Sequence, residues 1–320
     1  MRVSAIATLA KVVVPILSSC NCISNRQGLR TDICGVSEER GYDTPLQQEN
    51  VPRWMTLDMD LRTRTENQTA INYVPGNWQV YELTRVRIGL EVRPARWLTA
   101  YLQGQDTHAL GLPLPYVAAN MRNTFDARQA YLNFHVKPVT IIAGRQGLKY
   151  GGERLVGISN WTNNSRTWDG FLGRIGDKNR LDVFSTSVVT VHPTSLDKHG
   201  AGLNFHGAAG TITTWVPHTT ITPFVFVRSV RQVTSQQGVV GGETEATPGI
   251  EADGDLGKGW DYHALGALQR GSYSNDSIHS GAGFAKVGYT ATHCLETSPS
   301  RRVQLCHGQR SSKRSTGQHV

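Results

Sequence analysis

The sequence predicts an all-β protein: an antiparallel transmembrane β-barrel that is incomplete, with roughly 12–14 strands of a larger barrel. Three observations predict this fold. Short segments alternate apolar with polar residues throughout the body of the chain. No run offers the roughly 18 apolar residues that a membrane helix needs, so any span must be made of strands. The composition does not change between residues 51 and 292, which favours one large domain.

The clearest alternation runs from residue 81 to residue 93. Side chains along a strand point alternately to its two faces, so one face here is apolar and the other is charged. A soluble sandwich would bury the apolar face, whereas an outer-membrane barrel would turn it to lipid, and alternation alone leaves both open. The apolar face carries Val86, Ile88, Leu90 and Val92, and the charged face carries Arg85, Arg87, Glu91 and Arg93.

The same pattern predicts about thirteen strands in order along the body. Tight polar turns join several of them, and three longer loops are expected at 107–124, 149–166 and 232–245. Short turns at one rim and long loops at the other are typical of bacterial outer-membrane barrels. The expected strands lie near 54–65, 79–93, 96–106, 125–136, 138–148, 167–176, 180–192, 199–208, 210–217, 221–231, 246–256, 259–270 and 280–291.

The first 50 residues differ from the body. Residues 1–22 have the charge and apolar run of an export signal, although Lys11 interrupts the run. Cys20 follows Leu17-Ser18-Ser19, which matches either a bacterial lipoprotein cleavage box or a chance cysteine after a signal region. Residues 23–50 are polar and aperiodic, so we expect a disordered leader.

Cysteine, histidine and charge distributions narrow the function classes. The 5 cysteines all lie outside residues 35–293 and show no C-x-x-C spacing, and the 11 histidines are scattered, so we expect no metal site and no cofactor. Hydrolase, zinc-protease and phosphate-loop motifs are missing, so we expect no enzyme. Half of the net charge of +8 comes from residues 293–320, and the modest remainder does not indicate a nucleic-acid partner.

Five ordered runs together resemble the alginate-export porin family of Gram-negative outer membranes. The resemblance covers about residues 54 to 292 and implies a single-chain barrel that passes an anionic polysaccharide through an arginine-rich pore. It also implies export through the periplasm to the bacterial outer membrane, with outer-membrane lipid around the barrel. The runs are Tyr81–Leu90, Trp97–Asp106, Asp126–Leu132, Ala143–Gln146 and Trp161–Gly170.

Arginines recur at the polar positions of the strands, with acidic residues between them. A guanidinium stays charged and can bind a carboxylate through two hydrogen bonds, so a column of arginines offers an anionic saccharide or a small anion many weak sites. The alternatives are cross-strand ion-pair ladders that stiffen the wall, or the exposed face of a soluble sheet. The candidate pore-lining residues are Arg62, Arg64, Arg85, Arg87, Arg128, Arg145 and Arg174.

The segment from Trp161 to Trp168 has two interpretations. Its aromatic and Asn side chains could form a platform for sugar stacking. The simpler interpretation, which we favour, is an ordinary loop followed by Trp168 as an interface aromatic at a strand start.

The alternation stops near residue 293, and Ser, Arg, Gln and Lys dominate the rest of the chain. We therefore expect residues 293–320 to be a disordered tail. Our hypothesis for this abrupt change is a frameshift in the gene near residue 293.

The sequence leaves two functions open. The first is an outer-membrane channel for anionic oligosaccharides, polysaccharides or small anions, and the second is a soluble or surface-attached all-β carbohydrate-binding protein.

Overall fold

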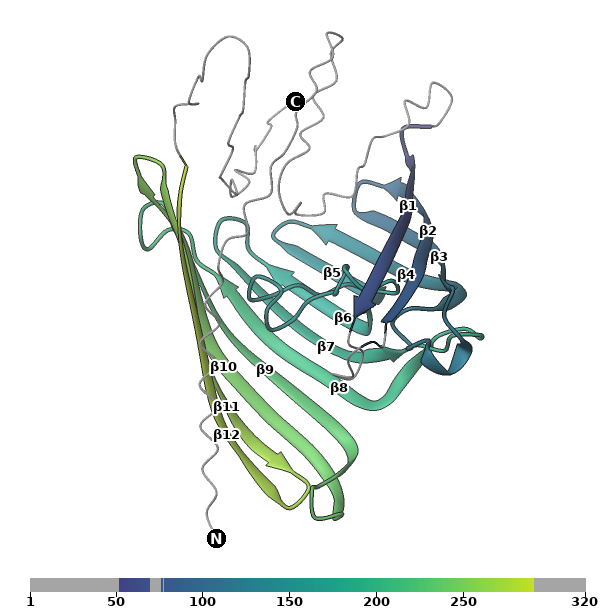
Figure 1. The fold of residues 1–320 in the computed structure, drawn as a ribbon. Coiled ribbons are helices and arrows are strands. Elements are labelled where there is room, and N and C mark those ends of the chain that lie inside the picture. The colour runs from purple at the N-terminus through teal and green to yellow at the C-terminus, as the bar shows by residue number, and fades with distance from the viewer. Residues whose placement is uncertain (1–51, 70–75, 77, 291–320) are drawn as a thin grey trace, which may run out of the picture. The chain divides into compact units, whose positions relative to one another are not determined.

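A single curved sheet of twelve antiparallel strands makes up the fold, and the strands follow one another in sequence order (Figure 1). The computed structural model describes residues 52–69, 76 and 78–290. The strands are β1 (Met55–Thr69), β2 (Trp78–Ala95), β3 (Leu98–Leu110), β4 (Asn123–Val136), β5 (Val139–Gln146), β6 (Trp168–Ile175), β7 (Arg180–Thr190), β8 (Lys198–Thr211), β9 (Thr219–Thr234), β10 (Val240–Gly257), β11 (Trp260–Tyr273) and β12 (Asp276–Tyr289).

The all-β antiparallel meander confirms the predicted fold class, and twelve strands fall within the predicted number. Among the described residues β1 and β12 each pair with one neighbour, so the sheet is the wall of a barrel that is not closed. The predicted signal peptide 1–22, leader 23–50 and tail 293–320 lie outside the described residues.

Within the part of the chain that the structure describes, no helix has both the length and the apolar character needed to cross a membrane.

Two details of the predicted strand order are wrong. The expected strand 199–208 continues to Thr211 as β8, through a run of small residues around Gly207, whereas most of the expected strand 210–217 is the turn before β9. A Cβ at Gly207 would meet ring atoms of Phe184 and Phe226, so the small residue accommodates these rings rather than a turn. The expected long loop 232–245 is also mostly strand, because β9 and β10 extend to within a few residues of each other.

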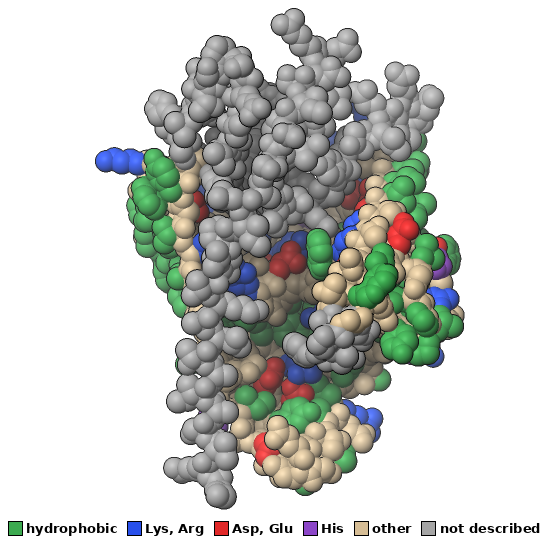
Figure 2. Space-filling model, viewed as in Figure 1, with side chains coloured by type: hydrophobic (Ala, Val, Ile, Leu, Met, Phe, Trp, Pro, Cys, Tyr) green, Lys and Arg blue, Asp and Glu red, His purple; other side chains and the backbone are tan. Residues whose placement is uncertain are grey.

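The two faces of the sheet have different chemistry, as β2 shows. Ile88 is 49% exposed on the outer face, whereas Arg87 next to it is 4% exposed on the concave face. In the register between β1 and β2, Met59 pairs with Ile88 and Asp60 pairs with Arg87, so apolar pairs face outward and charged pairs face inward. Figure 2 shows hydrophobic side chains along the outer margins and charged ones in the hollow. The predicted outward face of Val86, Ile88 and Leu90 is confirmed.

An apolar core lies on the concave side, where the sequence predicts a polar lining. It forms because the segment between β5 and β6, residues 147–167, folds back onto the sheet and buries Leu148 and Val156. The wall supplies Trp168 from β6, together with aromatic residues of β7 and β9. Burying one such aliphatic side chain is worth about 1.5–3 kcal/mol. We call residues 147–167 the inward loop.

The interface-aromatic interpretation of Trp168 is therefore wrong. Its side chain is 2% exposed and belongs to the concave core rather than to the outer surface. A strand-start tryptophan is a girdle residue only when its position along the alternation turns it outward. At Trp168 the alternation turns the ring inward, beneath the inward loop.

Candidate functional site

Four of the predicted arginines converge on the concave face at the start of the sheet. Arg62 and Arg64 occupy alternate positions of β1, and Arg85 and Arg87 occupy alternate positions of β2. Residues two apart on a strand share a face, and Arg62 lies directly opposite Arg85 in the register. We call these four residues the arginine cluster.

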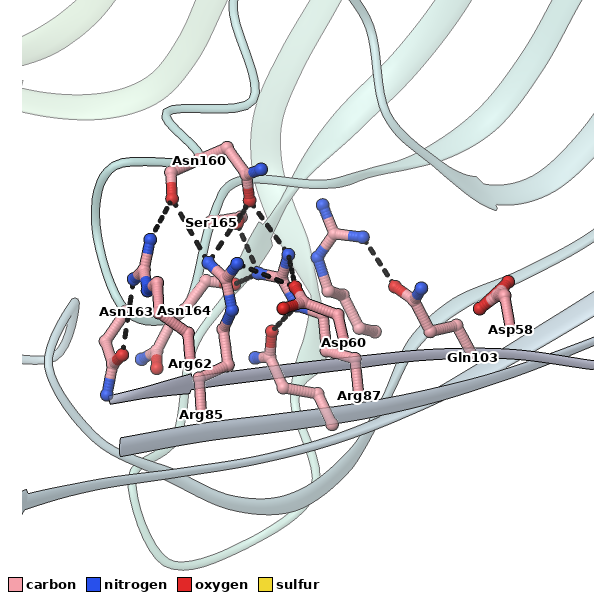
Figure 3. Close-up of polar contacts among 12 residues, drawn as sticks. Asp58, Asp60, Arg62, Arg85, Arg87, Gln103, Asn160, Asn163, Asn164 and Ser165 are labelled. Carbon is pink, nitrogen blue, oxygen red and sulfur yellow. Dashed lines mark hydrogen bonds and ion pairs between the residues drawn. The ribbon is translucent and has the colours of Figure 1, made fainter. Parts of the chain in front are cut away.

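Backbone oxygens of the inward loop face the cluster. Arg62 donates to the carbonyl oxygen of Asn160 at 2.9 Å and to that of Thr162 at 3.0 Å. Arg85 also donates to the Asn160 oxygen, at 3.1 Å, and Arg64 donates to the Trp161 oxygen at 2.7 Å. Figure 3 shows the guanidinium groups of Arg62, Arg85 and Arg87 reaching from the two strands toward this part of the loop.

Arg87 is buried, with 4% of its side chain exposed. It donates from Nη1 to Asn160 Oδ1 at 2.8 Å, from Nη2 to Ser165 Oγ at 2.5 Å, and from Nε to Gln105 Oε1 at 2.7 Å (Figure 3). The carboxylate of Asp60 lies 3.7 Å from Arg87 and 2.7 Å from Arg85. These buried donors are therefore satisfied mainly by neutral oxygens, with Asp60 shared between two arginines.

Two asparagines fix the loop in this position. Asn163 is 1% exposed and donates to the carbonyl oxygens of Thr84 and Met121, both at 2.9 Å. Asn164 accepts a hydrogen bond from Thr107 Oγ1 at 2.5 Å. The backbone N–H of Arg166 donates to the Ile158 oxygen at 2.6 Å and closes the base of the turn. Sequence reasoning missed the bonds of the two asparagines because each joins residues far apart in the chain.

The remaining predicted arginines also form polar contacts on the strands. Arg128 donates to Gln103 Oε1 at 2.6 Å. Arg145 pairs with Asp169 at 2.8 Å and with Asp126 at 3.3 Å, and Arg174 pairs with Asp182 at 3.3 Å. The latter two arginines thus take part in cross-strand ion pairs of the kind that the ladder interpretation describes.

The arrangement suits reversible binding of anions. A carboxylate adds the attraction of opposite charges to the hydrogen bond from a guanidinium, and it can accept two parallel bonds, whereas a carbonyl oxygen is uncharged. The loop carbonyls at Asn160, Trp161 and Thr162 therefore occupy positions in which a carboxylate oxygen would bind more strongly. The cluster can hold the loop when no anion is present and can exchange it for an anion.

Two titratable groupings outside the cluster were not expected from the sequence. Glu251, Asp253 and His263 bring potential metal-ligand atoms within 4.8 Å of one another, and His263 Nδ1 lies 2.5 Å from Asp253 Oδ1. Asp197, in the turn between β7 and β8, accepts bonds from the backbone of His192 and from Asn123. Burial, together with the neighbouring Asp126 carboxylate, raises the pKa of Asp197 to about 6.

Comparison with known proteins agrees with the observed fold. A model of the family described as alginate export matches residues 53–311. The match continues beyond residue 293, and the frameshift hypothesis stays a prediction. No curated protein matches the chain significantly. The matched family is one of transport channels of the outer membrane rather than of enzymes, and the match spans most of the sequence. The chain therefore belongs to the alginate export family.

Proposed function

We propose that this chain is an outer-membrane channel for anionic, alginate-like oligosaccharides and polysaccharides, in which the predicted arginines form the anion-binding lining. Family membership supports an export channel, and the carboxylates of a polyuronate are the groups that arginines bind best. We place export through the periplasm, a signal peptide at residues 1–22 and surrounding outer-membrane lipid in the same proposal.

One observation carries this proposal: the four guanidinium groups of the arginine cluster converge on the concave face and are met by uncharged loop oxygens. A structural ladder would match each arginine with its own carboxylate, as Arg228 is matched with Glu243. At the cluster, Arg64 pairs with Glu66 at 2.6 Å, but Arg85 and Arg87 share the single carboxylate of Asp60. This leaves a region of positive potential that favours anions.

A transport step follows from the exchange of acceptors. An incoming carboxylate replaces a carbonyl of the inward loop at one guanidinium, and the next carboxylate of the polymer does the same at a neighbouring arginine. Repeated weak sites let a chain advance, whereas one tight site would retain it. Arg145, with 15% of its side chain exposed, and Arg174, with 39%, extend the lining away from the cluster.

Conductance measurements in planar bilayers test the proposal. Under a potassium chloride gradient the wild-type channel should prefer anions, as measured by the reversal potential. Arg62→Gln and Arg64→Gln should each reduce that preference, because each removes one fixed positive charge from the proposed path. Arg93→Gln is the matched control, because Arg93 is 58% exposed at the end of β2 and belongs to the ion pair with Glu91.

If the anion preference is unchanged in both cluster variants, the arginine cluster only holds the inward loop and does not bind permeating anions. A folded product that stays in the aqueous fraction and never forms channels would favour the soluble carbohydrate-binding alternative. Small anions that permeate while oligouronates neither permeate nor block the current would limit the substrate to small anions.

A further inference from the structure

A cavity of about 400 Å³ lies between the inward loop and the wall, and its lining combines apolar and polar side chains. The loop contributes Leu155, Val156 and Arg166, and the wall contributes inward-facing residues of strands β6 to β11. Ligand sites of proteins commonly have this size and consist of an apolar surface with a few converging polar groups. The cavity includes none of the four residues of the arginine cluster.

The apolar side of the cavity is aromatic. Phe205 of β8 is half-buried there, and its ring centroid lies 5.9 Å from that of Phe226 of β9. Trp168 completes this side. The face of a sugar ring that carries C–H groups packs well against such surfaces, because it is the apolar side of an otherwise polar molecule.

The polar side provides groups for an acid and for hydroxyls. Arg166 is exposed, and its guanidinium makes no hydrogen bond or ion pair with any residue that the structure describes. Its backbone is nevertheless held by the bond to Ile158, which fixes where the side chain starts. Glu245 and Gln269 line the same cavity and can accept bonds from hydroxyl groups.

The second arginine of the cavity is already engaged. Arg228 Nη1 lies 2.5 Å from the carboxylate of Glu243, which is 3% exposed. Among the residues that the structure describes, Arg166 is therefore the guanidinium of this cavity that is available to a ligand carboxylate. A cation without a partner among the described residues, an aromatic surface and hydroxyl acceptors together match an acidic sugar better than a neutral sugar or an apolar molecule.

We propose that this cavity is a binding subsite for one acidic sugar residue, with its ring against Phe205 and its carboxylate at Arg166. The proposal rests on the proposed saccharide function and adds a second place at which the polymer is held, away from the arginine cluster. Because the inward loop supplies one wall, a sugar in the subsite contacts the same loop that the cluster holds.

Isothermal titration of the folded protein in detergent with digalacturonate, and with the neutral disaccharide galactobiose, tests the subsite. Wild type should bind the acidic disaccharide at least tenfold more tightly. Arg166→Gln should remove that difference, and Phe205→Leu should weaken binding of the acidic disaccharide several-fold. Arg154→Gln is the matched control, because Arg154 lies on the same loop but packs over the ring of Phe284, with 3.7 Å from its Cζ to the ring centroid.

Equal affinity of wild type for both disaccharides, or unchanged binding in Arg166→Gln, would overturn the subsite. Heat-modifiable gel mobility establishes that each variant is folded before binding is compared. If the titration overturns the subsite but the channel still prefers anions in bilayers, the proposed channel function stands. If the bilayer measurements show no anion preference but saccharide binding still depends on Arg166, the channel function is rejected and the cavity remains a saccharide-binding site.

Discussion

Asp182 shows how one buried side chain joins the wall to the inward loop. The carboxylate is 1% exposed, lies 2.9 Å from Arg180 and 3.3 Å from Arg174, and accepts the hydroxyl hydrogen of Tyr150 at 3.1 Å. Burial first, and the charge of Asp182 second, raise the pKa of Tyr150, so the phenol stays a neutral donor at physiological pH.

Replacing Asp182 with alanine should therefore destabilise the protein strongly. Removing one partner of a buried ion pair leaves charges without compensation and costs about 3 kcal/mol or more. Denaturant unfolding in detergent micelles measures the loss. Asp177→Ala, at an exposed turn position, is the control and should change the free energy of unfolding by no more than about 0.5 kcal/mol. Equal effects of the two variants would contradict this account of Asp182.

Asp197 gives a second prediction at this scale, one that depends on pH. The pKa of Asp197 is about 6 in the folded protein, against an ordinary value of 3.8 for an aspartic acid side chain. Between these two pH values the folded state therefore keeps a proton on this carboxyl group that the unfolded state has released. The free energy of unfolding should therefore fall as pH rises through this window, by an amount on the order of 1 kcal/mol because the carboxyl is only half-buried.

Asp197→Asn tests this dependence, since it removes the titrating group and keeps an oxygen for the His192 backbone. Unfolding in detergent at pH 4.5 and pH 7.5 should show a smaller difference for the variant than for wild type. An identical difference in the two proteins would mean that another group is responsible.

At the scale of elements, the inward loop combines two kinds of attachment. Its first half packs Leu148 and Val156 into the concave apolar core, and its second half is held by hydrogen bonds to the arginine cluster. Apolar packing is insensitive to anions, whereas the bonds to arginine can be exchanged for bonds to a carboxylate. The second half is therefore the part of the loop that can be released.

The double variant Asn163→Ala, Asn164→Ala should loosen this second half. It removes the hydrogen bonds that pin the loop to β2, β3 and the segment before β4. Amide hydrogen exchange of residues 158–166 should become faster, and single-channel conductance should rise. Asn179→Ala, in the turn between β6 and β7, is the amide control. Faster exchange with unchanged conductance would show that the loop does not narrow the conducting path.

At the scale of the whole molecule, the outer face of the sheet decides where the protein can reside. Leu61 is 71% exposed, Ile88 49% and Val183 50%, and all three lie at outward positions of their strands. Such a surface is costly in water and favourable against lipid.

A charge on this face should prevent membrane assembly. Arginine near the middle of a bilayer costs a barrel about 2–4 kcal/mol, and less near the interface. We expect Val183→Arg, in the central strand β7, to reduce the heat-modifiable, membrane-bound fraction. Val239→Arg, in the turn between β9 and β10, should leave it unchanged. Normal folding of Val183→Arg in the aqueous fraction would contradict the barrel.

The sequence by itself determined the architecture of this protein. The alternation along β2 identified both faces of the sheet, because neighbouring side chains of a strand must point in opposite directions. Antiparallel order followed from short turns between consecutive strands. The arginines at positions 62, 64, 85 and 87 were identified on this basis as residues of the polar face. The structure turns that face inward and brings the four together through the register of β1 and β2.

The tertiary structure alone decided what those arginines contact. Alternation describes neighbours along a strand, but the acceptor of Arg62 at Asn160 lies 98 residues away on a loop without periodicity. The same fold-back buries Trp168, which the local pattern assigned to the outer interface. Loop placement depends on long-range packing and on the satisfaction of buried donors, and no local period of the sequence encodes either.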